Sequence, residues 1–108
     1  MEVLKIYITY RTKKLEEICN NIKEARKEIG DKASKKLIQR VTELKSFTNL
    51  QMVPTFLPWR REKLVNEKDM WSIRIDSNFR IEFMALDIND DLRLIEHIKI
   101  MEVSKHYG

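Results

Sequence analysis

The chain has few of the residues that interrupt or cross-link a fold. It contains two glycines, two prolines and one cysteine. Scarce glycine and proline predict regular helices and strands over most of the length. A single cysteine excludes an internal disulfide and is typical of a reducing compartment. The N-terminus lacks the apolar run of a signal peptide, and no stretch approaches the length of a membrane span. We therefore expect a cytoplasmic protein without membrane attachment.

What the chain has in quantity is charge. Charged residues make up 35% of its 108 residues, and the formal net charge is +4. The length fits a single domain, residues 1–108, with one modest core. The mild basic excess permits an RNA, DNA or acidic protein partner without requiring one. Cys19 lies on an apolar helical stripe, far in sequence from any His, so we expect a core residue there, and neither a metal nor a cofactor.

Residues 70–86 carry the clearest pattern. Apolar and polar side chains alternate in two runs, as in strands with one buried face. Residues 76–78 between them are types that favour turns. A three-residue loop there sets apolar residues opposite each other: Ile75 and Phe79, Ile73 and Ile81, Trp71 and Phe83. A two-residue loop would scramble the faces, so the sequence predicts a hairpin with the longer turn.

The other face of this hairpin brings two arginines together. The predicted register sets Arg74 directly opposite Arg80. Like charges across a strand pair are destabilising. Two explanations remain open at this point: the pair binds an anion, or both side chains are solvated, splayed apart and screened.

The N-terminal half predicts a strand followed by two helices. Residues 2–10 alternate as a strand, and Thr12 can cap a helix that ends at Gly30. Asp31 is then expected to cap a second helix, and so short a link predicts an antiparallel helical hairpin. The two apolar stripes are Leu15, Ile18, Cys19, Ile22, Ala25 and Ile29, then Ala33, Leu37, Val41, Leu44 and Phe47.

After a turn, residues 92–103 predict a third strand of the hairpin sheet. The expected register sets Ala85 beside Leu94 and Arg80 beside Lys99, with a slip of two residues allowed by the pattern. Arg74, Arg80 and Lys99 would then form a basic row. The order strand, helix, helix, then three or four antiparallel strands predicts a two-layer α+β domain whose helices cover the apolar face.

Residues 50–69 are broken by two prolines and are harder to interpret. Residues 55–61 are compatible with a short strand that leads into a basic tip. Trp59, which precedes Arg60 and Arg61, either stacks on a base while the arginines hold phosphate or packs on the domain itself.

These features together resemble a known family. The element order, the hairpin WSIRIDSNFRIEF, the opening YRTKKLEEIC and the closing IKIMEVSKHYG are similar to the RelE/ParE superfamily of type II toxin–antitoxin toxins, and most to its HigB-type killer branch. The resemblance covers nearly the whole chain. It implies a RelE-like fold, a toxin that enters the A site of the 70S ribosome and cuts mRNA, and a cognate antitoxin. The implied chemistry needs no metal, because the RNA 2′-hydroxyl attacks the adjacent phosphate.

The resemblance also implies roles for individual residues. Arg80 matches a hairpin arginine that contacts the scissile phosphate, and Arg60 stands where the branch has a second phosphate ligand. His106 and Tyr107 stand near a terminal Tyr–His pair, so either is a candidate acid or base. Leu57 and the order of the terminal pair depart from the branch pattern. The expected RNA-binding residues around these four are Trp59, Arg61, Lys63, Arg74, Lys99 and Lys105.

Two alternatives to the nuclease remain open on the sequence. A toxin of the same fold inhibits DNA gyrase in the ParE branch, and an inactive relative would retain only antitoxin binding. A nuclease needs clustered cations with a proton donor beside the phosphate, whereas an inhibitor needs only a binding face. His106 is either that donor or a frayed tail residue, and Tyr107 either joins it or packs back on the sheet.

Overall fold

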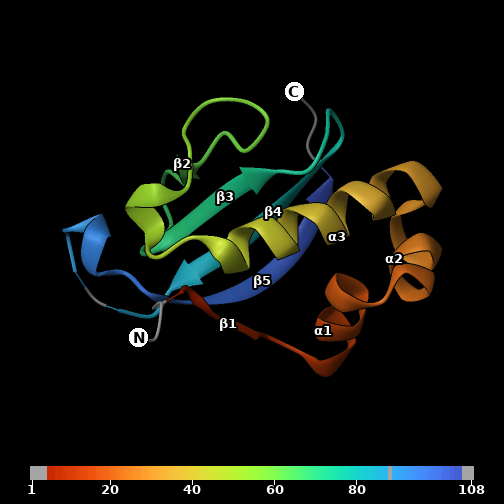
Figure 1. Cartoon of the computed structure of the whole chain (residues 1–108), viewed down its shortest axis with the longest axis horizontal. Helices are drawn as coiled ribbons and strands as arrows, with labels where there is room; N and C mark the ends of the chain where they lie inside the picture. The colour runs from red at the N-terminus through yellow and green to blue at the C-terminus, as the bar shows by residue number, and fades with distance from the viewer. Residues whose placement is uncertain (1–4, 88, 106–108) are drawn as a thin grey trace.

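The computed structural model describes residues 5–87 and 89–105 (Figure 1). The elements are β1 (Tyr7–Tyr10), α1 (Lys13–Asn20), α2 (Ile22–Ile29), α3 (Asp31–Ser46), η1 (Leu50–Met52), β2 (Glu62–Lys63), β3 (Met70–Arg74), β4 (Phe79–Ala85), η2 (Leu92–Leu94) and β5 (His97–Lys105). The sheet has five strands in the order β1-β5-β4-β3-β2. The predicted α+β class is confirmed. The sheet is mixed rather than wholly antiparallel, because β1 pairs in parallel with β5.

The core lies between the sheet and the helices, with α3 crossing one face of the sheet (Figure 1). Leu37 of α3, Ile73 of β3, Phe83 of β4 and Ile100 of β5 are fully buried in one cluster. Burial of each such side chain stabilises the fold by about 1.5–3 kcal/mol. None of the helices in the described ranges has the length and apolar content needed to cross a membrane.

The central hairpin has the predicted register. Trp71 pairs with Phe83, and Arg74 pairs with Arg80. The turn closes because the Asp76 carboxylate accepts hydrogen bonds from the backbone N–H groups two and three residues later, at 2.8 and 2.9 Å. This local hydrogen bonding is typical of Asp at the start of a turn. The hairpin therefore holds the two arginines side by side on the face opposite the core.

The predicted first helix is in fact two helices. Asn21 leaves the helical region with φ −129° and ψ 114°. Its side chain caps α2 by accepting a hydrogen bond from the N–H of Lys23. Thr12 caps α1 and Gly30 ends α2 at φ +86°, both as predicted. The apolar period continues through the break, so the pattern alone did not reveal it. Cys19 is buried in the core, as expected.

Asp31 does not cap α3. Gly30 occupies the cap position, and no side chain supplies the cap hydrogen bond. Asp31 is instead the first helical residue, with its carboxylate 3.0 Å from Arg26 and 3.4 Å from Lys35. An acidic group in the first turn still complements the helix dipole.

The first strand is shorter than the predicted range of residues 2–10. Within the described residues it is β1, Tyr7–Tyr10.

The strand that follows the hairpin, β5, begins later than the predicted residue 92. The Asp87 carboxylate accepts hydrogen bonds from the backbone N–H groups of Glu96 and His97, which holds the preceding residues in a loop and starts β5 at His97. Ala85 consequently pairs with Ile98, a shift of four residues, and a bulge between Glu82 and Phe83 alters the register again. A bulge of this kind is not visible in a period-two pattern.

This shift breaks the predicted basic row. Lys99 pairs with Met84, and Arg80 pairs with Ser104 instead. Met84 lies four residues along β4 from Arg80, which is about 13 Å at the rise of a strand. Residues 55–61 form no strand either; the short strand of this region is β2, which pairs with β3 at the sheet edge.

Candidate functional site

Three arginines line one small cavity on the solvent side of the hairpin. The cavity has a volume of about 70 Å³, and its lining is Arg60, Glu62, Ser72, Arg74, Phe79 and Arg80. We call it the arginine cleft. Arg74 and Arg80 come from β3 and β4, and Arg60 comes from the irregular segment before β2. The site thus joins a rigid hairpin to a loop.

Arg80 is the most firmly held of the three arginines. Its Nε lies 3.1 Å from Glu82 Oε2 and 3.3 Å from Ser104 Oγ, and the Ser104 hydroxyl donates to the same carboxylate oxygen. The Arg80 side chain is 29% exposed. Among the hydrogen bonds within the described ranges, none uses its two Nη groups. The guanidinium is therefore oriented by Nε and has donors left for a ligand.

Arg60 is held more loosely. Its backbone has φ +46°, in the left-handed region that residues with a side chain seldom adopt. Its Nε lies 2.8 Å from Glu62 Oε1, but the Arg60 side chain is 57% exposed. An ion pair this exposed stabilises by at most about 1 kcal/mol. An anion can therefore replace Glu62 as the partner of Arg60 at little cost.

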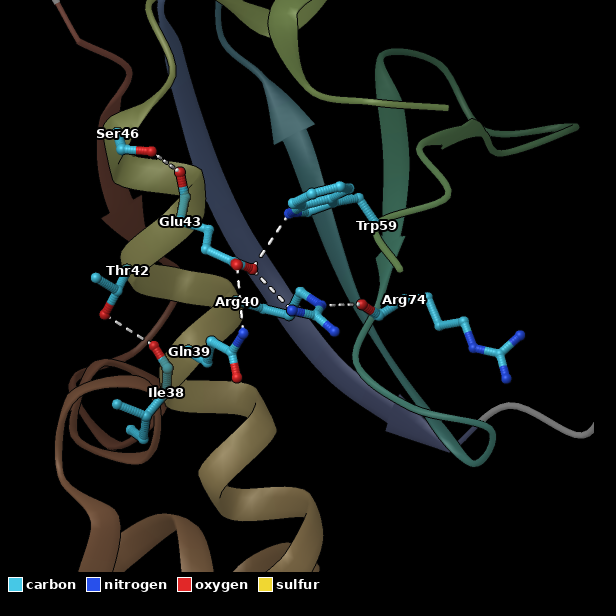
Figure 2. A network of polar contacts seen from close by, with 8 residues as sticks. All are labelled: Ile38, Gln39, Arg40, Thr42, Glu43, Ser46, Trp59 and Arg74. Atoms are coloured by element: carbon cyan, nitrogen blue, oxygen red, sulfur yellow. Dashed lines mark hydrogen bonds and ion pairs between the residues drawn. The ribbon is translucent and has the colours of Figure 1, made fainter. Parts of the chain in front are cut away.

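Arg74 has its backbone fixed by two hydrogen bonds and is part of the cleft lining. Its N–H donates to the carbonyl of Trp59 at 2.7 Å, and its carbonyl accepts from Arg40 Nε at 3.1 Å. Its side chain points away from Arg40 (Figure 2). No ion pair of Arg74 is present in the described part of the chain.

The charges around the cleft favour an anion. Two carboxylates, Glu62 and Glu82, offset two of the three guanidinium groups. The charge of Arg74 is left without a carboxylate among these pairs, and Arg74 lies directly opposite Arg80 on the neighbouring strand. Guanidinium groups match the oxygen atoms of phosphate in a planar, two-pronged geometry. The cleft is suited to one phosphate group.

The cleft has fewer groups for proton transfer than groups for binding phosphate. In the described lining of the cleft, Glu62 is the side chain that can take up a proton. His106 and Tyr107, the predicted acid–base pair, lie outside the described residues. Lys105 pairs with Phe79, so the described chain ends beside a residue of the cleft lining. His97 packs against Tyr7 at the opposite end of β5.

Two predicted RNA-binding residues pack on the domain instead of facing the cleft. The indole Nε1 of Trp59 donates to Glu43 at 3.2 Å, and its ring makes edge contacts with Phe47 and Phe56. Arg61 Nη1 donates to the carbonyl of Leu50, and the Arg61 guanidinium lies 5.5 Å from the centre of the Trp71 ring. Burial lowers the pKa of the Arg61 guanidinium. The packing alternative for Trp59 is thus the one the structure shows.

The three predicted lysines also lie outside the cleft. Lys63 Nζ donates to the backbone carbonyls of Leu64 and Glu67, and its strand position is opposite Trp71. Lys99 is separated from Arg80 by the register shift described above. Lys105 is at the end of β5, opposite Phe79. The structure brings together Arg60, Arg74 and Arg80 from the predicted set.

Sequence reasoning missed an ion pair on α3 between a buried arginine and a partly buried glutamate. Arg40 was not among the expected core or site residues, yet its side chain is 4% exposed and its Nη1 lies 2.7 Å from Glu43 Oε1. The signal was its spacing, because Arg40 follows Leu37 by three residues and precedes Leu44 by four, on the apolar stripe. Glu82 and Ser104, which orient Arg80, were missed as well.

Comparison with known proteins shows the fold. No protein-family model matches the chain, and no curated protein matches it significantly. Among solved structures it is similar to the YoeB dimer from Staphylococcus aureus, with 21% identity and a TM-score of 0.56, over 94% of this chain and 98% of that chain. The YoeB–YefM complex from the same organism gives 20% identity, a TM-score of 0.55 and the same coverage. The predicted RelE-like architecture is therefore confirmed.

Proposed function

We propose that this protein is the toxin of a type II toxin–antitoxin pair and acts as a metal-independent endoribonuclease on mRNA in the ribosome. The observation that carries the proposal is the arginine cleft, a phosphate-sized cavity on a fold shared with YoeB. One of the similar structures is a complex of YoeB with a second protein, YefM. We propose a cognate antitoxin as the corresponding partner here. The HigB-type motifs suggest the branch.

The cleft supports cleavage by the RNA itself. Attack of a 2′-hydroxyl on the adjacent phosphate places extra negative charge on the phosphoryl oxygens before the 5′-oxygen leaves. Fixed guanidinium donors stabilise such charge without reorganising. Arg80 is held by Glu82 and Ser104, so it is the group we assign to the scissile phosphate, with Arg60 and Arg74 as the other phosphate ligands.

Two proton transfers complete the reaction. A general base takes the 2′-hydroxyl proton, and a general acid protonates the leaving 5′-oxygen. Glu62 is the candidate for the base, since it lines the cleft and its side chain is paired, within the described residues, with the exposed Arg60. His106 and Tyr107 are the candidates for the acid. The cleft is too small to enclose an RNA strand, so we assign most substrate positioning to the ribosomal A site.

The test is an assay with purified 70S ribosomes and a defined mRNA, in which new 5′ ends are mapped by primer extension. The proposal predicts new ends within A-site codons, and only when ribosomes are present. Intact mRNA under both conditions would contradict it. A gyrase supercoiling assay on the same preparation would then separate a ParE-like inhibitor from an inactive relative.

A further inference from the structure

Arg40 lies in an unusual place for a charged side chain. It projects from the middle of α3 and is 4% exposed. A buried arginine is rare unless it is paired, and an apolar residue at such a site often stabilises a fold equally well. Its partners therefore indicate what the charge does there. Arg40 Nη1 lies 2.7 Å from Glu43 Oε1, and its Nε donates to the carbonyl of Arg74.

These contacts belong to a closed ring of four residues. Glu43 Oε1 also accepts from the indole Nε1 of Trp59 at 3.2 Å, and the carbonyl of Trp59 accepts from the N–H of Arg74 at 2.7 Å. The ring runs Arg40, Glu43, Trp59, Arg74 and back to Arg40, as Figure 2 shows for its side-chain contacts. We call it the α3 clamp.

The α3 clamp holds both sides of the arginine cleft. Trp59 directly precedes Arg60, and Arg74 is itself part of the cleft lining. The segment that carries Arg60 has no strand pairing of its own, because β2 begins only at Glu62. Backbone bonds from Arg60 to Phe56 and from Arg61 to Pro54 shape the loop itself. On the side of Arg60 away from β2, the segment is tied to β3 by the bond from the Arg74 N–H to the Trp59 carbonyl, which is part of the clamp.

We propose that Arg40 and Glu43 are positioning residues that set the separation of Arg60 and Arg74 in the cleft, and so the geometry in which a phosphate is held. The inference rests on the proposed function for its substrate, but its geometric part concerns any phosphate. Neither Arg40 nor Glu43 belongs to the cleft lining. They act through the backbone of Arg74 and the indole of Trp59.

A matched set of variants separates positioning from stability. Trp59→Phe keeps an aromatic side chain and removes the indole N–H that donates to Glu43. Glu43→Gln keeps the shape and removes the charge that faces Arg40. Val41→Ala is the control, since Val41 is buried on the same helix, has no polar group and leaves the clamp intact. All variants are measured below the unfolding transition of the least stable one, with the unfolding midpoint recorded for each.

The first readout is ribosome-dependent cleavage at saturating toxin concentration. The inference predicts that Trp59→Phe and Glu43→Gln lower the single-turnover rate by roughly ten- to a hundredfold, because a misplacement of about 1 Å has effects of that order. Val41→Ala should keep the rate despite a lower midpoint. Equal losses in all three variants, tracking the midpoints, would overturn the inference and leave a purely stabilising role.

The second readout does not depend on the nuclease. Inorganic phosphate is titrated into the protein while the side-chain Nε–H signals of the arginines are followed by NMR. Wild type and Val41→Ala should bind phosphate alike, and the two clamp variants should bind it several-fold more weakly. If wild type binds phosphate without cleaving mRNA, and the clamp variants bind phosphate more weakly, the proposed function fails and the clamp stands. If wild type binds no phosphate, or if the clamp variants bind it equally well, the clamp inference fails.

Discussion

Arg74 and Arg80 lie directly opposite each other on β3 and β4, and both line the same small cavity. The hairpin register that creates this pair is enforced from the other face, where Ile73 and Ile81 are fully buried. Slipping the register by one residue would expose the core side chains. The fold therefore maintains an unfavourable charge pair at fixed positions, as expected for a site that receives an anion.

Replacing Arg74 should stabilise the protein while impairing its activity. Arg74→Thr removes a like-charge pair across two strands, and such pairs are worth about 0.2–1 kcal/mol, so the free energy of unfolding should rise by that amount. Ribosome-dependent cleavage should fall at the same time. Urea denaturation and primer extension measure the two effects. Lys99→Thr is the control, because Lys99 faces Met84; a lower stability for Arg74→Thr would show that the pair is not repulsive.

Glu62→Gln tests the proposed base. The amide keeps the shape of the side chain and cannot take up a proton, so the cleavage rate should fall by about 10²–10⁴-fold, the usual contribution of general acid–base catalysis. The unfolding midpoint should change little, since the Arg60–Glu62 pair is exposed. Glu67→Gln, on the loop after β2, is the matched control. Full activity of Glu62→Gln would move the base to another residue.

Removal of residues 106–108 tests the proposed acid. The truncated protein should cleave poorly, because His106 and Tyr107 are the assigned candidates for protonating the leaving oxygen. It should unfold at the same denaturant concentration as the full chain, because the buried core residues from Ile6 to Ile100 are all retained. Single substitutions His106→Ala and Tyr107→Phe then divide the effect. Unchanged cleavage by the truncated chain would exclude both residues from the chemistry.

Cys19 should be inert in the folded protein. Burial raises the pKa of its thiol to about 12, so the thiolate that reacts with alkylating reagents is scarce at pH 8. Iodoacetamide should modify it only as fast as the protein opens. The thiol holds its proton more tightly in the folded protein than in the unfolded chain. The protonated Cys19 therefore contributes its full stabilisation below about pH 9, and this contribution decreases as the pH rises toward 12.

The measurement for that dependence is the difference in unfolding free energy between wild type and Cys19→Ala at pH 8 and pH 10. The wild type should lose more stability than the variant over this interval. Rapid alkylation of the native protein at pH 8, or an equal loss of stability in both proteins, would show that the thiol is accessible and its pKa ordinary.

The parts of the fold that were predictable depend on local information. The central hairpin follows from a period of two and from Asp76, whose side chain closes its own turn. The start of β5 was missed because it depends on the Asp87 carboxylate binding two N–H groups nine and ten residues later. The break at Asn21 was missed because the apolar period passes through it.

The same distinction applies to the site. Arg74 and Arg80 meet because of the hairpin register, so the sequence pattern alone pairs them. Arg60 lies in a loop and itself has a positive φ. The basic run after Trp59 and the family resemblance both pointed to Arg60 as a phosphate ligand, but neither placed it beside Arg74. Arg40 was missed because arginine is mostly an exposed residue type. Its spacing on the apolar stripe indicates burial, but not that Glu43 and the backbone of Arg74 are its partners.

The most direct test of the central claim compares wild type, Arg80→Ala, Arg80→Lys and Arg93→Ala in the ribosome cleavage assay. Arg93 is an exposed arginine paired with Asp91, and it is not part of the cleft lining. Loss of one preorganised donor at a developing charge costs about 10²–10³-fold in rate. We predict that loss for Arg80→Ala, a smaller one for Arg80→Lys, and wild-type cleavage for Arg93→Ala. Full cleavage by a folded Arg80→Ala protein would contradict the assignment of the arginine cleft as the place where the phosphate is held.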